Sequence, residues 1–301
     1  MGVPVGVAAI DLMVGVPHDG EWTKAYESLV RDAESRRYGH GAEYMYHDRP
    51  DVGRSGYEAV VLGEMDRCNV QLGLIPVTFE DRLARSLLER HPGRFAGSWM
   101  VDPNRGMDAV RDLERAVTEL GVVAATCFPA GLQPQVPIND RRLYPIYAKC
   151  IELDIPICIN AGVPGPRFPY ECQYVGLLDE VCWFFPELRI VTRHGCEPWE
   201  DLAVKLLLKY PNLYYSTSAF APKYYPKAIV EYANTRGADK VMYAGYFPSG
   251  LSLERIFGEL PDVPFRDHVW PKFLRENALR VFKLGDRLGL GAAGEPPGDD
   301  R

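Results

Sequence analysis

The stretch that decides the fold runs from residue 188 to residue 217 and reads LRIVTRHGCEPWEDLAVKLLLKYPNLYYST. Its two ends, Leu188–Thr192 and Leu213–Thr217, are apolar and β-branched, as expected of strands that are covered on both faces. Between them, Trp199–Lys209 follows a proline and places Leu202 and Leu206 on one helical face. A strand, a helix and a second strand in this order predict two parallel strands joined by a crossover helix.

The same alternation continues in both directions along the chain. A further helical stretch, Asp108–Leu120, shows the apolar spacing of an outer helix. The predicted strands are Val5–Met13, Val70–Val77, Phe95–Val101, Val122–Phe128, Pro156–Ala161, Leu188–Thr192, Leu213–Thr217 and Lys240–Ala244. Eight such units predict a (β/α)8 barrel that forms one domain over residues 1–288. The last residues, 289–301, are rich in glycine, proline and acids and are expected to form a flexible tail.

Composition narrows the classes of protein that this chain can be. Its 301 residues are 47% hydrophobic, which suits one large barrel core. A formal charge of −7, with no run of basic residues, argues against binding to nucleic acid. We see neither a secretory signal nor an apolar stretch of membrane-spanning length. Seven cysteines without a C-x-x-C pair fit reduced thiols, so we expect a cytoplasmic protein that does not bind a membrane.

One long excursion separates the first two predicted strands. It covers residues 14–69 and contains an amphipathic stretch near Glu21–Arg36 and a loop from Gly39 to Gly56 that is rich in glycine, proline and aspartate. Loops after the strands of such a barrel open on the face where ligands bind. We therefore expect a lid over the site, and simple elaboration of the surface remains the alternative.

The ends of the predicted strands carry a recognisable pattern. The segments concerned are Ile10-Asp11, Ile157-Cys158-Ile159-Asn160-Ala161-Gly162, His194-Gly195 with Pro198-Trp199, and Ala244-Gly245-Tyr246-Phe247-Pro248. Over residues 5–285 the chain resembles the amidohydrolase-related superfamily, in the branch of the aminocarboxymuconate-semialdehyde decarboxylase-like enzymes. The resemblance implies an amidohydrolase-like barrel and chemistry of the hydrolase or carboxy-lyase type.

The resemblance also implies a divalent metal at the strand ends, but this chain departs from the pattern. The family's metal-holding histidines and aspartate fall on Met13, Gly15, Asn160 and Tyr246, and only His194 matches. A thioether, a glycine, a carboxamide and a phenol are poor ligands for a hard or borderline cation. We therefore predict that the family's usual metal site is not rebuilt.

Five residues are candidates for catalysis: His194, Asp11, Tyr246, Asn160 and Glu197. The imidazole is suited to move a proton, and the phenol and carboxamide can donate hydrogen bonds to an oxyanion. The alternatives are structural. A lone histidine can be a satisfied structural residue, the aspartate can cap a loop, and the glutamate can satisfy a helix N-terminus. The tyrosine and asparagine can simply fill the space of a lost metal.

The sequence leaves two possibilities for a cofactor: no metal, or one divalent metal held by replacement ligands. The replacement ligands would be Asp11, Glu43, His47 and His194, provided that the long loop folds over the barrel. Their spacing is no known ligand motif, and a solvated loop is the other interpretation.

Three residues are candidates for binding substrate. Arg167 follows the fifth strand, where a guanidinium suits an acidic group. Lys223 and Tyr224 belong to an aromatic and basic run after the seventh strand, which could hold an acyl thioester. A solvated arginine and a packing or subunit interface are the alternatives.

Two classes of function remain. The first is an enzyme that acts on a carboxylated or acyl-thioester small molecule, without metal or as a metal-dependent oxygenase with replacement ligands. The second is a non-catalytic barrel that pairs with an active sister chain. A polar cluster with shifted pKa values would favour the first, and a mouth plugged by Met13, Tyr246 and aromatic side chains would favour the second. We expect a homodimer or a hetero-oligomer with a related barrel.

Overall fold

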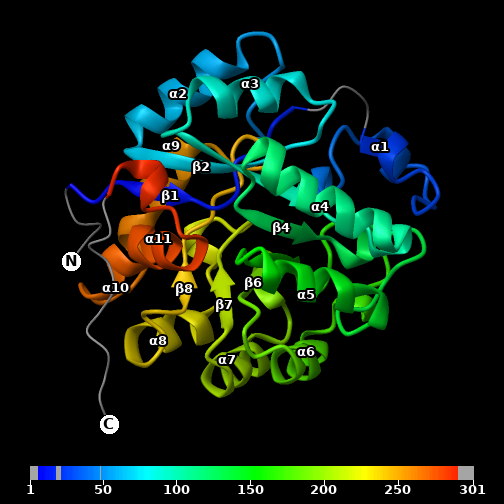
Figure 1. The fold of residues 1–301 in the computed structure, drawn as a ribbon. Coiled ribbons are helices and arrows are strands. Elements are labelled where there is room, and N and C mark those ends of the chain that lie inside the picture. Colours follow the sequence, from blue (N-terminus) through cyan, green and yellow to red (C-terminus); the bar gives the residue numbers. More distant parts are fainter. Residues whose placement is uncertain (1–5, 18–21, 48, 291–301) are drawn as a thin grey trace.

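A computed structural model describes residues 6–17, 22–47 and 49–290. The described residues form one sheet of eight strands. Figure 1 colours the chain from blue at the N-terminus to red at the C-terminus. The strands are β1 (Ala9–Asp11), β2 (Val70–Pro76), β3 (Phe95–Met100), β4 (Ala124–Cys127), β5 (Ile157–Asn160), β6 (Ile190–Arg193), β7 (Leu213–Ser216) and β8 (Val241–Met242). All eight predicted strands are therefore confirmed, although each is shorter than predicted. Residue 5, the predicted start of the first strand, and residues 291–301 of the predicted tail lie outside the described residues.

The strands are parallel, and each pairs with the next in sequence from β1 to β8. The sheet curls round so that its two edges meet. The backbone N–H of Leu12 donates to the carbonyl of Tyr243 at 3.4 Å, and that of Gly15 donates to the carbonyl of Phe247 at 2.8 Å. The chain therefore has the predicted α/β fold of a (β/α)8 barrel.

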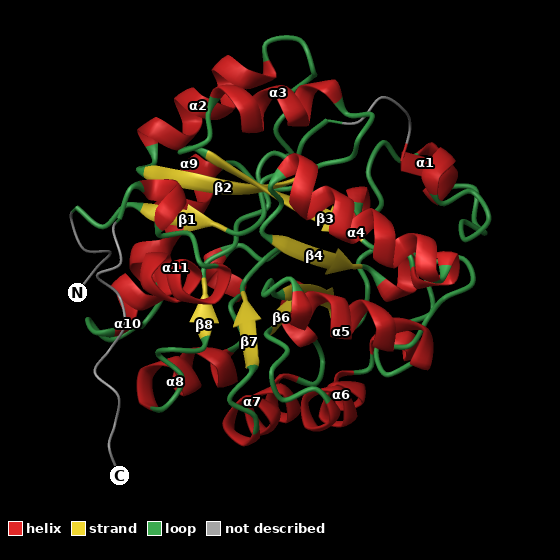
Figure 2. Ribbon diagram, viewed as in Figure 1, coloured by secondary structure: helices red, strands yellow, loops and turns green. Residues whose placement is uncertain are grey.

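Helices surround the sheet (Figure 2). They are α1 (Trp22–Ala25), α2 (Tyr57–Arg67), α3 (Arg82–Arg90), α4 (Met107–Leu120), α5 (Tyr144–Glu152), α6 (Leu178–Phe184), α7 (Glu200–Lys209), α8 (Lys227–Thr235), α9 (Leu253–Glu259), α10 (Val269–Pro271) and α11 (Asn277–Phe282). The predicted helices at Asp108–Leu120 and Trp199–Lys209 are confirmed as α4 and α7. No helix in the described parts of the chain is long and apolar enough to cross a membrane.

An inner apolar layer fills the barrel. This inner layer contains one side chain in two from each strand, such as Leu72, Cys158 and Val191. Val281 and Phe282 of α11 belong to the same layer. The C-terminal helix thus closes the end of the barrel at which the strands begin, and the opposite end is left for a site.

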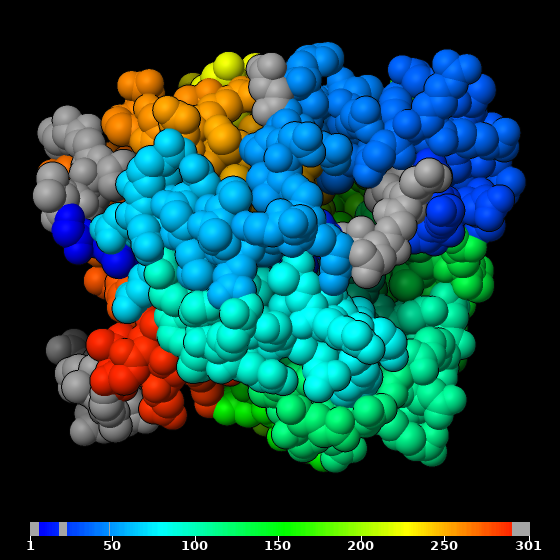
Figure 3. Space-filling model, turned by 90° about the horizontal axis from the view of Figure 1, so that it is seen from above, coloured from blue at the N-terminus to red at the C-terminus, as the bar shows by residue number. Residues whose placement is uncertain are grey.

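The long insertion is mostly irregular before α2, which forms its last part. Within residues 22–37, which include most of the amphipathic stretch, the chain is helical at α1 and in the turn Ser35–Arg37. The insertion lies beside the green central part of the chain in the space-filling view (Figure 3, blue). Tyr44 donates a hydrogen bond to the carbonyl of Gly165 in the β5 loop, at 2.7 Å. The insertion therefore contacts the loops at the carboxyl ends of the strands.

Candidate active site at the carboxyl end of the barrel

The carboxyl end of β6 places two basic side chains next to each other. Arg193 is the last residue of the strand and is 9% exposed. It lies two positions after Val191, whose side chain is in the inner layer, so it shares that inward face. Its Nη2 donates to the carbonyl of Leu12 at 3.2 Å. Because β7 and β8 separate β6 from β1, this hydrogen bond crosses the interior of the barrel.

His194 begins the turn after β6 with a φ of 64°, a left-handed conformation that only tight local structure sustains. Its backbone N–H donates to Ser218 Oγ at 3.0 Å. The imidazole Nδ1 is buried without a hydrogen-bond partner. Burial, followed by the charge of Arg193, lowers the pKa of His194 to about 3. The imidazole is therefore neutral at pH 7.

A second histidine comes from the insertion. His40 Nε2 lies 3.1 Å from the Tyr246 hydroxyl, so one of the two groups donates to the other. Burial, helped by the charge of Arg49, lowers the pKa of His40 to about 4. Burial also raises the pKa of Tyr246, which stays a neutral phenol. The Tyr246 ring lies edge-on to the His194 ring, with 5.7 Å between their centroids.

Tyr46 completes an aromatic group around this phenol. Its ring centroid lies 5.6 Å from that of Tyr246 and 6.0 Å from that of His40. Its hydroxyl donates to the carbonyl of Ala219 in the β7 loop, at 2.8 Å. Two loops that follow different strands and the insertion therefore meet at one point.

Asn160 lies beside Arg193, because the two residues are in register at the ends of β5 and β6. Its side chain is half-buried and shares the inward face with Cys158. The structure thus brings together three of the five predicted catalytic residues, His194, Tyr246 and Asn160.

Asp11 is buried in the wall of the barrel rather than in its mouth. Its Oδ1 accepts from the N–H of Gly245 at 2.7 Å and from that of Met13 at 2.9 Å. Its Oδ2 accepts from the Tyr243 hydroxyl at 3.3 Å. Burial raises the pKa of Asp11 to about 6 against these hydrogen bonds and the charge of Arg193. With both oxygens engaged, the carboxylate joins β1 to the segment after β8.

Glu197 does not serve as the helix cap that was the structural alternative. The first turn of α7 has no side-chain cap, and Glu197 contributes its backbone carbonyl to Val163 N–H at 2.7 Å. Burial, followed by the charge of Glu200, raises the pKa of the Glu197 carboxyl. Glu197 therefore helps to pack the loop after β6 against the loop after β5.

The three predicted substrate-binding residues lie apart from this cluster. Arg167 forms ion pairs with Asp32 at 2.8 Å and with Glu34 at 2.7 Å. Its expected carboxylate partners are therefore already present within the chain. Lys223 and Tyr224 are exposed on a short turn after β7, with the ammonium 4.9 Å from the ring centroid.

The residues present do not fit a divalent cation at the family's position. Glu43 turns back on its own loop, where its Oε2 accepts from Gly39 N–H at 2.6 Å, and His47 is exposed. No three histidine, cysteine, aspartate or glutamate side chains converge on a metal position within residues 6–17, 22–47 and 49–290. The guanidinium of Arg193 also brings positive charge to the interior. The replacement ligand set of Asp11, Glu43, His47 and His194 is not assembled.

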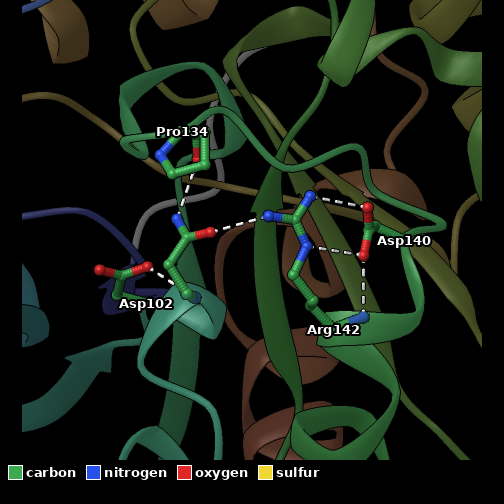
Figure 4. Close-up of polar contacts among 5 residues, drawn as sticks. Asp102, Pro134, Asp140 and Arg142 are labelled. Atoms are coloured by element: carbon green, nitrogen blue, oxygen red, sulfur yellow. Dashed lines mark hydrogen bonds and ion pairs between the residues drawn. The ribbon is translucent and has the colours of Figure 1, made fainter.

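Neighbouring loops on the same end are tied by polar contacts (Figure 4). Asn104, after β3, donates to the carbonyl of Pro134 at 2.9 Å and accepts from Arg142 Nη1 at 2.9 Å. Arg142 in turn forms a forked pair with Asp140, at 2.8 and 3.0 Å. This network fixes the β3 and β4 loops at one side of the site.

A groove of about 690 Å³ lies at the other end of the barrel, between Val7, Asn69, Arg94 and Arg275. It is far from the cluster because these residues precede or flank the starts of β1, β2 and β3. Ligands of parallel barrels bind at the carboxyl ends of the strands, so we place the candidate site there and not in the groove.

Sequence reasoning missed Arg193, His40 and Tyr46. The predicted sixth strand ends at Thr192, one residue before Arg193, so the inward position of Arg193 was not predicted. With the strand extended by one residue, alternation from Val191 puts the arginine on the inward face. No comparable signal exists for His40 and Tyr46, because an irregular loop has no period.

The barrel, the inward strand-end residues and the loops above them define a (β/α)8-barrel protein with a polar cluster at the carboxyl ends of its strands. The chain belongs to the Amidohydrolase family, whose sequence profile matches residues 43–284. A 2-keto-4-carboxy-3-hexenedioate hydratase from Sphingobium sp. (strain NBRC 103272 / SYK-6) is 29% identical over 132 residues. The match covers 38% of this chain and 39% of that protein, so the chain spans about two fifths of the length of this relative.

Two solved structures share the fold. An uncharacterized TIM-barrel protein from Bordetella bronchiseptica has a TM-score of 0.70 and 20% identity, over 93% of this chain and 99% of that one. A 5-carboxyvanillate decarboxylase from Novosphingobium aromaticivorans, solved with manganese and 4-hydroxy-3-methoxy-5-nitrobenzoic acid, has a TM-score of 0.67 and 15% identity, over 93% and 97%. The predicted membership of the amidohydrolase-related superfamily is confirmed by the family match.

Proposed function

We propose that the chain is an enzyme of the hydrolase or carboxy-lyase type that acts on a carboxylated small molecule. The site is the cluster at the carboxyl end of the barrel, and it works without a metal. The observation that carries the proposal is the imidazole of His194, whose buried Nδ1 lacks a partner beside the neutral phenol of Tyr246. A buried polar atom without a hydrogen bond lowers the stability of the fold, so such an atom is expected where a side chain binds a ligand or transfers a proton.

The roles follow from charge and position. His194 moves a proton to or from the reacting carbon or a water molecule. Tyr246 and Asn160 donate hydrogen bonds to the oxygen that gains negative charge, as neutral donors in a site with little water can do. An anion bound next to His194 would offset the charge of Arg193 and bring the imidazole pKa back towards neutrality.

The relatives support this substrate class. Both the hydratase and the decarboxylase carry names of reactions on carboxylated molecules. We extend to this chain the class of carboxylated substrates, and not the particular substrates of these two proteins. The insertion serves as the lid, a role supported by the contacts of His40, Tyr44 and Tyr46 with the loops after β8, β5 and β7.

The test is a screen of aromatic and unsaturated carboxylic acids for CO2 release, and of their carboxylated esters for hydrolysis, followed by His194→Ala. We expect the variant to lose at least about 10²-fold in kcat/KM because it lacks the proton-transfer group. Its melting temperature should stay close to that of the parent. His268→Gln, which removes an exposed histidine, is the control. Full activity in His194→Ala would refute the assignment.

A non-catalytic barrel is the second candidate. The observation that favours it is the mutual contact of the Tyr46, Tyr246 and His40 rings, which fills part of the mouth. Co-purification of a related barrel, with no turnover by the chain alone, would support it. Cytoplasmic location and assembly as a homodimer or with a related barrel remain our predictions.

A further inference from the structure

A buried guanidinium at the axis of a barrel requires a partner. Arg193 is 9% exposed, and its side chain crosses the barrel from β6 to the carbonyl of Leu12. A guanidinium has five N–H donors and remains charged at any working pH. Within the described residues it forms no ion pair, and Leu12 is its one hydrogen-bond acceptor apart from a contact with the Cys158 sulfur.

Most N–H donors of Arg193 have no acceptor among the described residues. Nη2 donates to the carbonyl of Leu12, and the Cys158 sulfur is the one further contact of the guanidinium. Arg193 keeps 9% of its surface exposed, so it is not fully enclosed. Asn160 lies beside it in register on β5, and His194 follows directly in the chain. Three potential hydrogen-bonding side chains thus adjoin the same space.

We propose that Arg193, flanked by Asn160 and His194, is the binding subsite for the carboxylate of a planar acid. This inference rests on the proposed function and deepens it by naming the group that the site holds. A guanidinium presents two parallel N–H groups that match the two oxygens of a carboxylate. Leaving a buried charge without a partner is costly, and a bound anion removes that cost.

The surroundings select a flat acid. The rings of Tyr46, Tyr246 and His40 form an aromatic wall in the same mouth, and such rings pack well against another planar group. One guanidinium, whose charge already acts on the buried Asp11 carboxyl, suits a singly charged carboxylate better than a phosphate dianion, which would require more positive charge. Arg193 thereby supplies positive charge where the family resemblance implies a metal, although it cannot supply a metal's chemistry.

Titration calorimetry of the full chain with benzoate and cinnamate tests the subsite, with benzamide and inorganic phosphate as comparisons. We expect both acids to bind the parent with Kd below about 10 mM, and Arg193→Met to weaken binding at least about 10-fold. Arg193→Lys keeps the charge without the fork and should lie between the two. Arg189→Met is the matched control, because Arg189 lies just before β6 at the far end of the barrel and pairs with Asp154.

The outcomes are distinct. Failure of both acids to bind the parent, equal binding by Arg193→Met, or binding of benzamide as tight as benzoate would overturn the subsite. If Arg193→Met does not fold by circular dichroism, Arg193→Lys decides: weakened binding supports the subsite and unchanged binding overturns it. Binding that depends on Arg193 without turnover of any acid would overturn the proposed function alone. Turnover with an unchanged KM in Arg193→Lys would overturn the subsite alone.

Discussion

The carboxylate of Asp11 holds the two edges of the sheet together at the point where the ladder of strands ends. Its Oδ1 accepts from the backbone of Met13 and Gly245, and its Oδ2 accepts from the Tyr243 hydroxyl. A Cβ on Gly245 would lie 2.5 Å from Oδ2, so the glycine is what lets the two segments approach. At the scale of the residue, Asp11 is a structural acceptor.

Two substitutions of Asp11 separate its hydrogen bonds from its charge. Asp11→Ala leaves two backbone N–H groups and a hydroxyl buried without an acceptor, which should lower the free energy of unfolding by about 2–4 kcal/mol. Asp11→Asn can keep both bonds to Oδ1 and offer its amide to Tyr243. We therefore expect Asp11→Asn to be at least about 2 kcal/mol more stable than Asp11→Ala at pH 7. Urea unfolding measures both, and equal losses would show that the charge matters more than the hydrogen bonds.

At the scale of the element, the loops after β5 and β6 fit against each other through backbone. Gly162 has a φ of 100°, and a Cβ there would lie 2.8 Å from the backbone carbon of Cys196 and from Glu197 N and O. Val163 N–H donates to the Glu197 carbonyl at 2.7 Å directly beside this contact. The approach fixes the β6 turn that carries His194.

Gly162→Ala should therefore destabilise the chain by at least about 2 kcal/mol, because the added methyl meets backbone that cannot rotate away and the φ is strained. The matched control is Gly63→Ala in α2, where nothing lies within 4 Å of the new methyl. That change should raise stability by about 0.5–1 kcal/mol, since alanine favours a helix. Thermal unfolding with a shift of the same sign in both variants would contradict this account.

The elements were predictable to the extent that they are periodic. Eight apolar runs and the helices between them follow from patterns in sequence, and the inward position of Asn160 follows from its place at the end of β5. Asp11 was a catalytic candidate because it matches the family's strand-one aspartate. Side chains alternate along β1, however, and Ile10 and Leu12 point into the barrel, so the side chain of Asp11 points into the wall. The contact of His40 with Tyr246 spans 206 positions through an irregular loop, and no local pattern encodes it.

At the scale of the whole molecule, three buried titratable groups make stability depend on pH. Burial lowers the pKa of His194 to about 3 and of His40 to about 4, from 6.5, and raises that of Asp11 to about 6, from 3.8. Near pH 5 the unfolded chain binds two more protons on the histidines, and the folded chain binds one more on the aspartate. The unfolded state thus holds one net extra proton, so these groups make stability rise with pH.

The size of this effect is about 1.4 kcal/mol per pH unit between pH 4.5 and 5.5, on top of the contribution of other carboxylates. His194→Gln removes one of the two histidine protons and should flatten the slope by about 1.4 kcal/mol per pH unit. Asp11→Asn removes the opposing proton and should steepen it by a similar amount. Urea unfolding at pH 4.5, 5.0 and 5.5 measures the three slopes, with the exposed His268→Gln as control. Equal slopes of stability against pH in all variants would mean that His194 and Asp11 have the same pKa in the folded and unfolded chain. A flatter slope in His194→Gln and a steeper slope in Asp11→Asn would place both groups in the buried environment described above.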